Sequence, residues 1–206
     1  MSSRIDRILL DAITSPEDVD RLVHETRADD SPARGVVIAP VFARRVVDAL
    51  RGSGIRVASV VGYPLGLAKP TVKAIEATSL AKDGVDAVEV TPLSHLILDD
   101  NWDALRDELL EIVRGVRAAR PTTSIHVRLD LDVLRDIDLA ATADAIARGA
   151  CDGVVLESKT YEPLALAITA IQQTFLECKV MIDTSADSPR FDAHAVGMPF
   201  KTSSST

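Results

Sequence analysis

The sequence is poor in aromatic residues, in cysteine and in long apolar runs, and each shortage excludes a class of protein. Aromatic side chains make up 3% of the 206 residues, so the core is built mainly from Val, Leu, Ile and Ala, as in stacked parallel strands and helices. Cys151 and Cys178 are the only cysteines and form no CxxC pair. We therefore expect two structural thiols in a reduced, cytoplasmic protein without a signal peptide. The longest apolar runs fall far below the ~20 residues that span a bilayer, so no membrane segment is expected.

Positive charge is also scarce, because 23 Lys and Arg oppose 31 Asp and Glu and leave a formal net charge of −8. No Lys/Arg cluster interrupts this balance, which argues against nucleic acid as a partner. A small anionic substrate is still compatible with the sequence, because the electrostatic field inside a pocket can be positive in a protein whose net charge is negative. The chain contains no HExxH, GxSxG, GxGxxG or Walker loop, and its acids follow no defined metal motif. We expect a small-molecule substrate and no cofactor or metal.

What the chain does contain is a regular alternation of predicted strands and helices. The strands are expected at residues 8–10, 35–40, 56–61, 87–91, 124–131, 153–156 and 179–184. The later helices are expected at residues 41–51, 71–82, 102–120, 138–148 and 162–176. Seven strands in this order predict an α/β fold, a (β/α)8 TIM barrel that forms a single domain over residues 1–206.

The predicted barrel is trimmed at its C-terminus, because such barrels typically need ~250 residues. Residues 186–206 are too few for a helix, a strand and a closing helix. They form either a minimal eighth strand at residues 200–202 or a polar tail. An incomplete barrel leaves strand edges or apolar faces uncovered, and we therefore expect a homo-oligomer.

The predicted fifth strand alternates apolar residues with His126, Arg128 and Asp130. The apolar set must pack under the helices, so the polar set points into the barrel. An imidazole, a guanidinium and a carboxylate in that interior need partners or a ligand. The pattern fits both a buried network that only fixes the core and a functional site.

The predicted fourth strand places one acid, Glu89, on the inward face beside the fifth strand. A salt bridge from Glu89 to Arg128 is expected, and it is compatible with catalysis because an Arg partner holds the acid in place. Parallel barrels carry their chemistry at the C-terminal ends of the strands. The carboxylates expected there are Glu89, Asp130, Glu157 and Asp183. Such a cluster suits general acid–base work, because mutual repulsion raises one pKa toward neutrality.

Several segments resemble, motif for motif, the deoxyribose-phosphate aldolase family. Residues 60–66 (VVGYPLG) are close to its VVGFPLG, Lys73 and Glu76 match its VKxxEA, and residues 84–90 are similar to its GADEIDMV. The resemblance spans about residues 5 to 190 and is strongest in these motifs. It implies an aldolase-type barrel.

The resemblance does not extend to the catalytic positions of that family. Family members use a Schiff-base lysine on strand six and a second lysine on strand seven, and these positions fall on Val155 and Asp183 here. A valine cannot form an imine. The Gly-rich phosphate loops that follow these strands in the family are replaced by sequences without glycine. Lys159, just after strand six, and Lys201, in a late KTSS segment, are the lysines that could restore an imine.

These patterns predict a lyase- or isomerase-type enzyme with lysine-independent acid–base catalysis on a small oxygenated or carbonyl metabolite. The expected reaction is that of a lyase, dehydratase, isomerase or cyclase. The expected catalytic residues are Glu89, Asp183 and His126. The residues expected to bind substrate are Arg128, Asp130, Glu157, Lys159 and Lys201. Two alternatives stay open: a lysine-dependent aldolase that uses Lys201 or Lys159, and a non-catalytic relative that only binds.

Overall fold

The computed structural model describes residues 5–28, 33–134, 137–158, 167, 170–171, 177–182 and 194–195. The strands are, in chain order, β1 (Ile5–Leu9), β2 (Ala33–Ile38), β3 (Arg56–Val61), β4 (Ala87–Val90), β5 (Ser124–Asp130), β6 (Gly153–Ser158), β7 (Glu177–Ile182) and β8 (His194–Ala195). The helices are α1 (Pro16–Arg27), α2 (Ala43–Leu50), α3 (Pro70–Asp83), α4 (Ser94–Leu98), α5 (Trp102–Ala119) and α6 (Leu139–Arg148), with a 3-10 turn, η1 (Pro40–Phe42). No helix in these ranges is long and apolar enough to cross a membrane.

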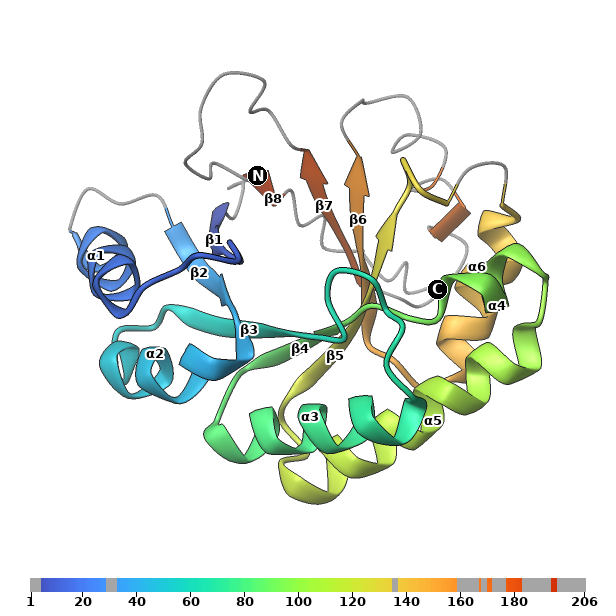
Figure 1. Ribbon diagram of the computed structural model, residues 1–206, viewed down its shortest axis with the longest axis horizontal. Coiled ribbons are helices and arrows are strands. Elements are labelled where there is room, and N and C mark those ends of the chain that lie inside the picture. Colours follow the sequence, from blue (N-terminus) through green and yellow to red (C-terminus); the bar gives the residue numbers. More distant parts are fainter. Residues whose placement is uncertain are drawn as a thin grey trace, which may run out of the picture.

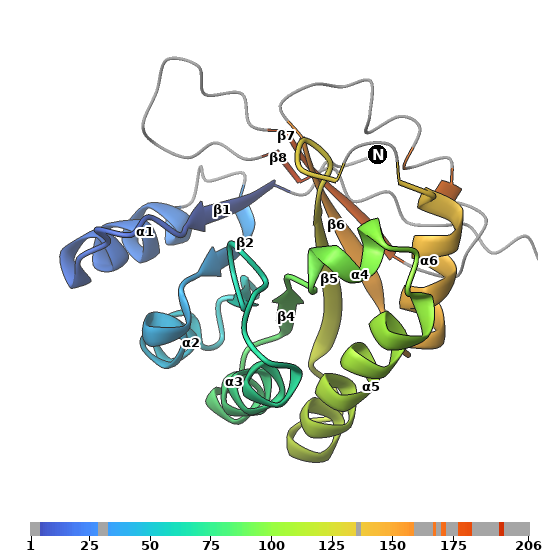
Figure 2. The same ribbon diagram turned by 45° about the vertical axis from the view of Figure 1, so that its right-hand side comes forward.

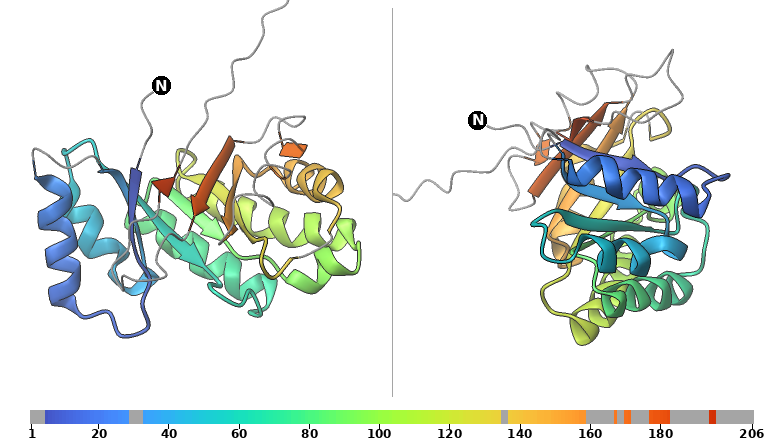
Figure 3. Two further views of the ribbon diagram at one scale, coloured as in Figure 1. Left: turned by 90° about the horizontal axis from the view of Figure 1, so that it is seen from above. Right: turned by 90° about the vertical axis from the view of Figure 1, so that its left-hand side faces the viewer.

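The strands form one curled sheet whose order follows the chain from β1 to β8 (Figure 1). Every neighbouring pair from β1 to β7 is parallel. The helices lie along the outside of the curl (Figure 2). β8 comes close to β1, so the two ends of the sheet approach each other (Figure 3). The predicted α/β fold, a (β/α)8 barrel trimmed at its C-terminus, is confirmed.

The last strand shows how the barrel is trimmed. β8 has two residues and pairs antiparallel with β7, through Met181 with Ala195 and Ile182 with His194. Residues 183–193 separate the two strands, and a parallel return needs a dozen or more residues, usually with a helix. Residues 200–202, the expected eighth strand, lie outside the described residues, as does most of the expected helix at 162–176.

Some element boundaries differ from the sequence pattern: β1, β2 and β7 each begin two or three residues earlier than expected. Two other differences have local causes. α2 begins at Ala43, two residues later than expected, because Pro40–Phe42 form a 3-10 turn first. β6 runs to Ser158 instead of ending at residue 156, because β7 pairs with it to the end. Glu157 therefore lies inside a strand, and its backbone is fixed by the ladder.

Two apolar layers flank the sheet. The outer layer, between sheet and helices, contains from β5 the residues Ile125, Val127 and Leu129. A smaller inner cluster is made of Ile8, Val37, Ala58, Val60 and Ala87. The structure agrees with the predicted alternation of β5, because its apolar residues all lie in the outer layer, whereas the buried Arg128 between them contacts Glu89 of β4. The apolar cluster comes from β1 to β4, whereas β4, β5 and β6 carry the charged inner positions.

Candidate functional site

Three charged side chains from adjacent strands meet near the C-terminal rim of the barrel, and we call them the Arg128 triad. Arg128 on β5 donates from Nη1 to Glu89 Oε2 on β4 at 2.5 Å and from Nη2 to Glu157 Oε1 on β6. The side chains of Arg128 and Glu89 are each 2% exposed, whereas that of Glu157 is 25% exposed. The expected Glu89–Arg128 salt bridge is confirmed. Glu157 is the member of the triad that reaches solvent.

Tyr63, on the loop after β3, covers the triad. Its ring centroid lies 5.1 Å from Arg128 Cζ, a distance at which a guanidinium is attracted to the face of an aromatic ring. Tyr63 is partly exposed, so part of its side chain reaches solvent at this end of the barrel. The strand-end loop thus adds a phenol to two carboxylates and a guanidinium.

The surroundings of the triad shift three pKa values. Burial disfavours the charged form of Arg128, but the Glu89 and Glu157 carboxylates outweigh it and raise its pKa. Burial raises the pKa of Glu157 above its usual range, and Arg128 offsets only part of that shift. Burial and the Glu157 charge raise the pKa of Tyr63. Glu157 is therefore a carboxyl whose pKa is moved toward neutrality, and Tyr63 stays a protonated hydrogen-bond donor.

A buried ion pair beneath the rim holds the loops after β3 and β4. Lys73 Nζ of α3 donates to Glu108 Oε1 of α5 at 2.6 Å and to the Thr91 carbonyl at 2.8 Å. Glu108 Oε2 accepts the backbone N–H of Leu93 at 3.1 Å. Both charged side chains are almost fully buried, at 0% and 1% exposed. The loop after β4 is thus tied to two helices at once.

The loop that carries Tyr63 is held by the same helix. The Gly62 N–H donates to Glu76 Oε2 at 2.9 Å, and the Lys73 stem packs against Gly62. Gly66 has φ +70°, and a Cβ there would lie 2.1 Å from the Pro92 carbonyl oxygen. Only glycine fits this approach of the two loops. The motif residues Lys73 and Glu76 therefore position the loop that carries Tyr63.

The structure places the other predicted site residues at different depths. His126 is fully buried and pairs in register with Glu89, one step below Arg128 on the same strand. Asp130 ends β5 at the exposed rim, where its Oδ1 accepts the backbone N–H groups of Asp132 and Val133. Asp183, Lys159 and Lys201 lie outside the described residues.

Tyr63 and Glu108 belong to the site although the sequence pattern did not single them out. Tyr63 is one of two tyrosines in the chain and follows a strand in a glycine-bearing loop at the predicted rim, which was a usable signal. Glu108 gave no such signal, since it lies in a charged helix and its partner Lys73 is 35 residues away.

The described residues form no cluster of three or more His, Cys, Asp or Glu side chains that could hold a metal ion. Cys151 is buried and free, and burial raises the pKa of its thiol to about 12. A thiol of that kind is unreactive, in agreement with the structural role expected for it.

The amino-acid sequence is similar to those of several named proteins of one family. It is 32% identical over 154 residues to the deoxyribose-phosphate aldolase of Deinococcus radiodurans, covering 75% of this chain and 67% of that protein. It is 30% identical over 161 residues to that of Aeropyrum pernix, covering 78% of this chain and 65% of that protein. These matches span about two thirds of each relative. No family model matches the chain.

Solved structures agree with these sequence relatives. The tetrameric deoxyribose phosphate aldolase from Aeropyrum pernix superposes with a TM-score of 0.73 at 25% identity, over 86% of this chain and 75% of that one. An aldolase named QR15 superposes with a TM-score of 0.73 at 19% identity, over 84% and 77% of the two chains. The sequence relatives and the shared barrel lead to one conclusion: the chain belongs to the deoxyribose-phosphate aldolase family.

Proposed function

We propose that this chain is an aldolase-like barrel enzyme that uses lysine-independent acid–base catalysis on a small carbonyl metabolite. The observation that carries the proposal is Glu157, a partly exposed carboxyl with a raised pKa that is held by the buried Arg128. A carboxyl in such a setting suits proton transfer near neutral pH. By the motif resemblance, the family's strand-six lysine position falls on Val155, and this valine is buried and pairs in register with Arg128.

The proposed step is removal of a proton from the carbon next to a carbonyl group. The C–H bond breaks, its electron pair forms an enolate, and the proton moves to the Glu157 carboxylate. Tyr63, whose phenol stays protonated, is placed to donate a hydrogen bond to the carbonyl oxygen. Glu89 holds Arg128 in place, and Arg128 in turn orients Glu157.

The other expected residues keep their roles within this proposal. His126 and Asp183 are proposed as further proton-transfer groups, and Asp130, Lys159 and Lys201 as substrate-binding groups. Reprotonation of the enolate at carbon gives an isomerase. Expulsion of a group on the β-carbon with its electron pair, protonated as it departs, gives a dehydratase or another lyase.

Glu157→Gln is expected to slow proton exchange by about 10²- to 10⁴-fold, the usual contribution of a positioned acid or base. The assay follows deuterium uptake from D₂O at the α-carbon of a panel of small aldehydes and ketones by proton NMR. The substitution keeps the shape and a hydrogen-bond acceptor for Arg128 but cannot take up the proton.

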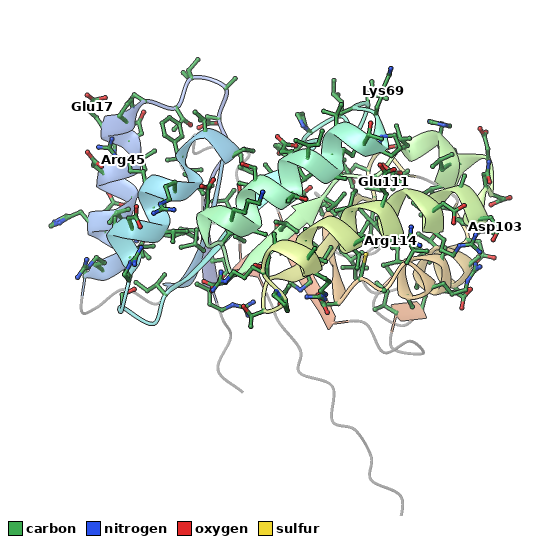
Figure 4. All side chains as sticks on the ribbon, turned by 90° about the horizontal axis from the view of Figure 1, so that it is seen from below. Glu17, Arg45, Lys69, Asp103, Glu111 and Arg114 are labelled. Carbon is green, nitrogen blue, oxygen red and sulfur yellow. The ribbon has the colours of Figure 1, made fainter. Side chains whose placement is uncertain are left out.

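Glu17→Gln is the matched control, because Glu17 is exposed on α1 at the outer surface (Figure 4). It should leave exchange unchanged. Borohydride reduction during turnover should add no mass to any lysine. A lysine adduct would support the lysine-dependent alternative, and exchange that survives in Glu157→Gln would reject the role of Glu157.

A second candidate function is a non-catalytic relative that binds a metabolite. The observation that favours it is the mutual pairing of the triad, since Arg128 already satisfies two carboxylates. This candidate predicts saturable binding and no α-carbon exchange by the wild-type chain. The NMR assay therefore separates the two candidates directly.

We also propose that the chain forms a homo-oligomer, as its Aeropyrum pernix neighbour does. Exposed apolar side chains gather on the loop after β3 and on the start of α3: Leu65, Leu67, Val72 and Ile75. Exposed apolar patches commonly mark such interfaces. Leu67→Glu is expected to shift the chain toward monomer in analytical ultracentrifugation, with Lys69→Glu as the control on the same loop. An unchanged assembly would place the interface elsewhere, and a wild-type chain that is already monomeric would contradict the proposed homo-oligomer.

A further inference from the structure

We propose that the chain has a second ligand site, a cleft at the N-terminal ends of β3 and β4 that binds a small phosphorylated compound. The cleft lies between the C-terminal ends of α2, α3 and α5, and its lining includes Arg56, the first residue of β3, and Asp86, which precedes β4. The Arg128 triad lies near the opposite, C-terminal ends of the strands. The cleft is therefore separate from the site of the proposed function and does not depend on it.

The cleft is large enough for a metabolite and opens to solvent. Its volume is about 820 Å³, within the ~300–1,000 Å³ that is usual for small-molecule sites, and every residue that lines it lies in the described range 33–134. One wall is the exposed loop from α2 to β3, where Gly52 and Gly54 both have a φ of +77°. A Cβ on either glycine would meet no atom within 4 Å. A ligand can therefore approach the backbone of this wall closely.

The lining of the cleft is rich in positive charge, although the chain as a whole has a net charge of −8. Cationic residues outnumber acidic ones there: Arg44, Arg51, Arg56, Lys82 and Arg120 against Asp83 and Asp86. Within the part of the chain that the structure describes, Arg56 and Lys82 form no hydrogen bond or ion pair through their side chains. Lys82 is exposed and Arg56 is half-buried. Both side chains are therefore available to a ligand.

One carboxylate holds two further guanidinium groups at the edge of the cleft. Arg44 Nε donates to Asp48 Oδ2 at 2.9 Å, and Arg51 Nη2 donates to Asp48 Oδ1 at 2.5 Å. A single negative charge thus serves two positive charges. Each guanidinium also keeps N–H groups that Asp48 does not use, and these can donate to an anion.

Arg120 stabilises the floor of the cleft. Its Nη1 donates to the carbonyl groups of Gly84 at 2.5 Å and Val85 at 2.6 Å, and its Nη2 lies 3.8 Å from Asp86 Oδ1. The C-terminal end of a helix carries partial negative charge, which repels an anion. Because Arg120 covers the carbonyl groups that follow α3, it weakens this repulsion where a ligand would sit.

An excess of positive charge remains when the ion pairs are set aside. Asp48 and Asp86 each neutralise one arginine, and Asp83 opposes the three cations that are left. Phosphate oxygens match the planar fork of arginine. The rest of the lining is mainly apolar: Val47, Leu50, Ile55, Val57, Ala81 and Ala119. The ligand class is therefore a phosphate ester with an apolar or ring-shaped part, as in a nucleotide.

The test is isothermal titration calorimetry of the wild-type chain with ADP and with adenosine, at low ionic strength and without divalent cations. ADP should bind as a one-to-one complex, and adenosine at least about tenfold more weakly, because it lacks the phosphate charges. Lys82→Gln and Arg56→Gln should each weaken ADP binding by about three- to tenfold, the effect of one charge at contact distance. Neither substitution breaks an ion pair, so circular dichroism should show an unchanged fold.

Lys69→Gln is the matched control. Lys69 is an exposed lysine that directly precedes α3, at the end of this helix away from the cleft (Figure 4). Its replacement should leave ADP binding unchanged. The absence of ADP binding at millimolar concentration, or adenosine that binds as tightly as ADP, would overturn the inference. So would an ADP affinity that falls equally in Lys69→Gln or stays unchanged in Lys82→Gln or Arg56→Gln, because ADP would then be bound elsewhere.

Discussion

Replacing Lys73 by methionine is expected to lower the free energy of unfolding by about 3–5 kcal/mol, the usual cost of breaking a buried ion pair from one side. Glu108 would remain almost fully buried with its charge uncompensated, and the Thr91 carbonyl would lose its donor. For a domain of this size the loss corresponds to a fall in melting temperature of about 10 °C. Urea unfolding, followed by the fluorescence of Trp102, the single tryptophan, measures the loss in free energy of unfolding.

The double variant Lys73→Met, Glu108→Leu separates a buried charge from a packing defect. Replacing both partners by apolar residues removes the uncompensated charge, so the double variant should recover much of the lost stability. Arg44→Met is the surface control, because it breaks the exposed Arg44–Asp48 pair and should change stability little. A Lys73→Met variant that is no less stable than Arg44→Met would show that the buried pair does not hold the rim loops.

Lys73 also marks the limit of what the sequence could predict. The match to the family's VKxxEA motif singled out Lys73 and Glu76. It did not signal burial, since a lysine in an amphipathic helix normally faces water. Its partner lies on another helix, and only the close packing of α3 on α5 brings them together. That packing depends on Gly115, where a Cβ would lie 2.4 Å from Thr78 Oγ1.

Strand patterns predicted more of the site than helix patterns did. The period-two alternation of β5 fixed which face Arg128 and His126 occupy, and parallel register then placed Glu89 beside them. The same logic could not tell that Glu157 lies inside β6, because that depends on how far β7 pairs with it. The Glu89–Arg128 pair was expected, but the second pair, of Arg128 with Glu157, likewise depends on side-chain geometry that no spacing reveals.

Arg128→Met is expected to cost about 3–5 kcal/mol of unfolding free energy at pH 7, because two carboxylates would lose their common cation. The loss should shrink as the pH falls. Burial already raises the pKa of Glu157, and without Arg128 nothing of that shift is offset by the guanidinium. The folded state of the variant then binds more protons than the unfolded state, so acid stabilises the variant relative to the wild type. The deficit is complete above the raised pKa of Glu157 and fades toward the unfolded value of about 4.3.

Urea unfolding of the wild type and of Arg128→Met at pH 7 and pH 5 measures the stability deficit of the variant at each pH. The deficit should be larger at pH 7, the direction already set by Glu157 in the wild type. The pKa of Glu157 is raised in the wild-type chain, so its ionisation costs stability as the pH rises, and removal of Arg128 enlarges that cost. Arg45→Met breaks the exposed Arg45–Asp20 pair between α2 and α1 and should show no such pH dependence (Figure 4). Adding Glu157→Gln to Arg128→Met should restore part of the stability at pH 7. A deficit equal at both pH values would mean that Arg128 contributes packing alone, and that the carboxylates of the triad do not depend on it for their charge.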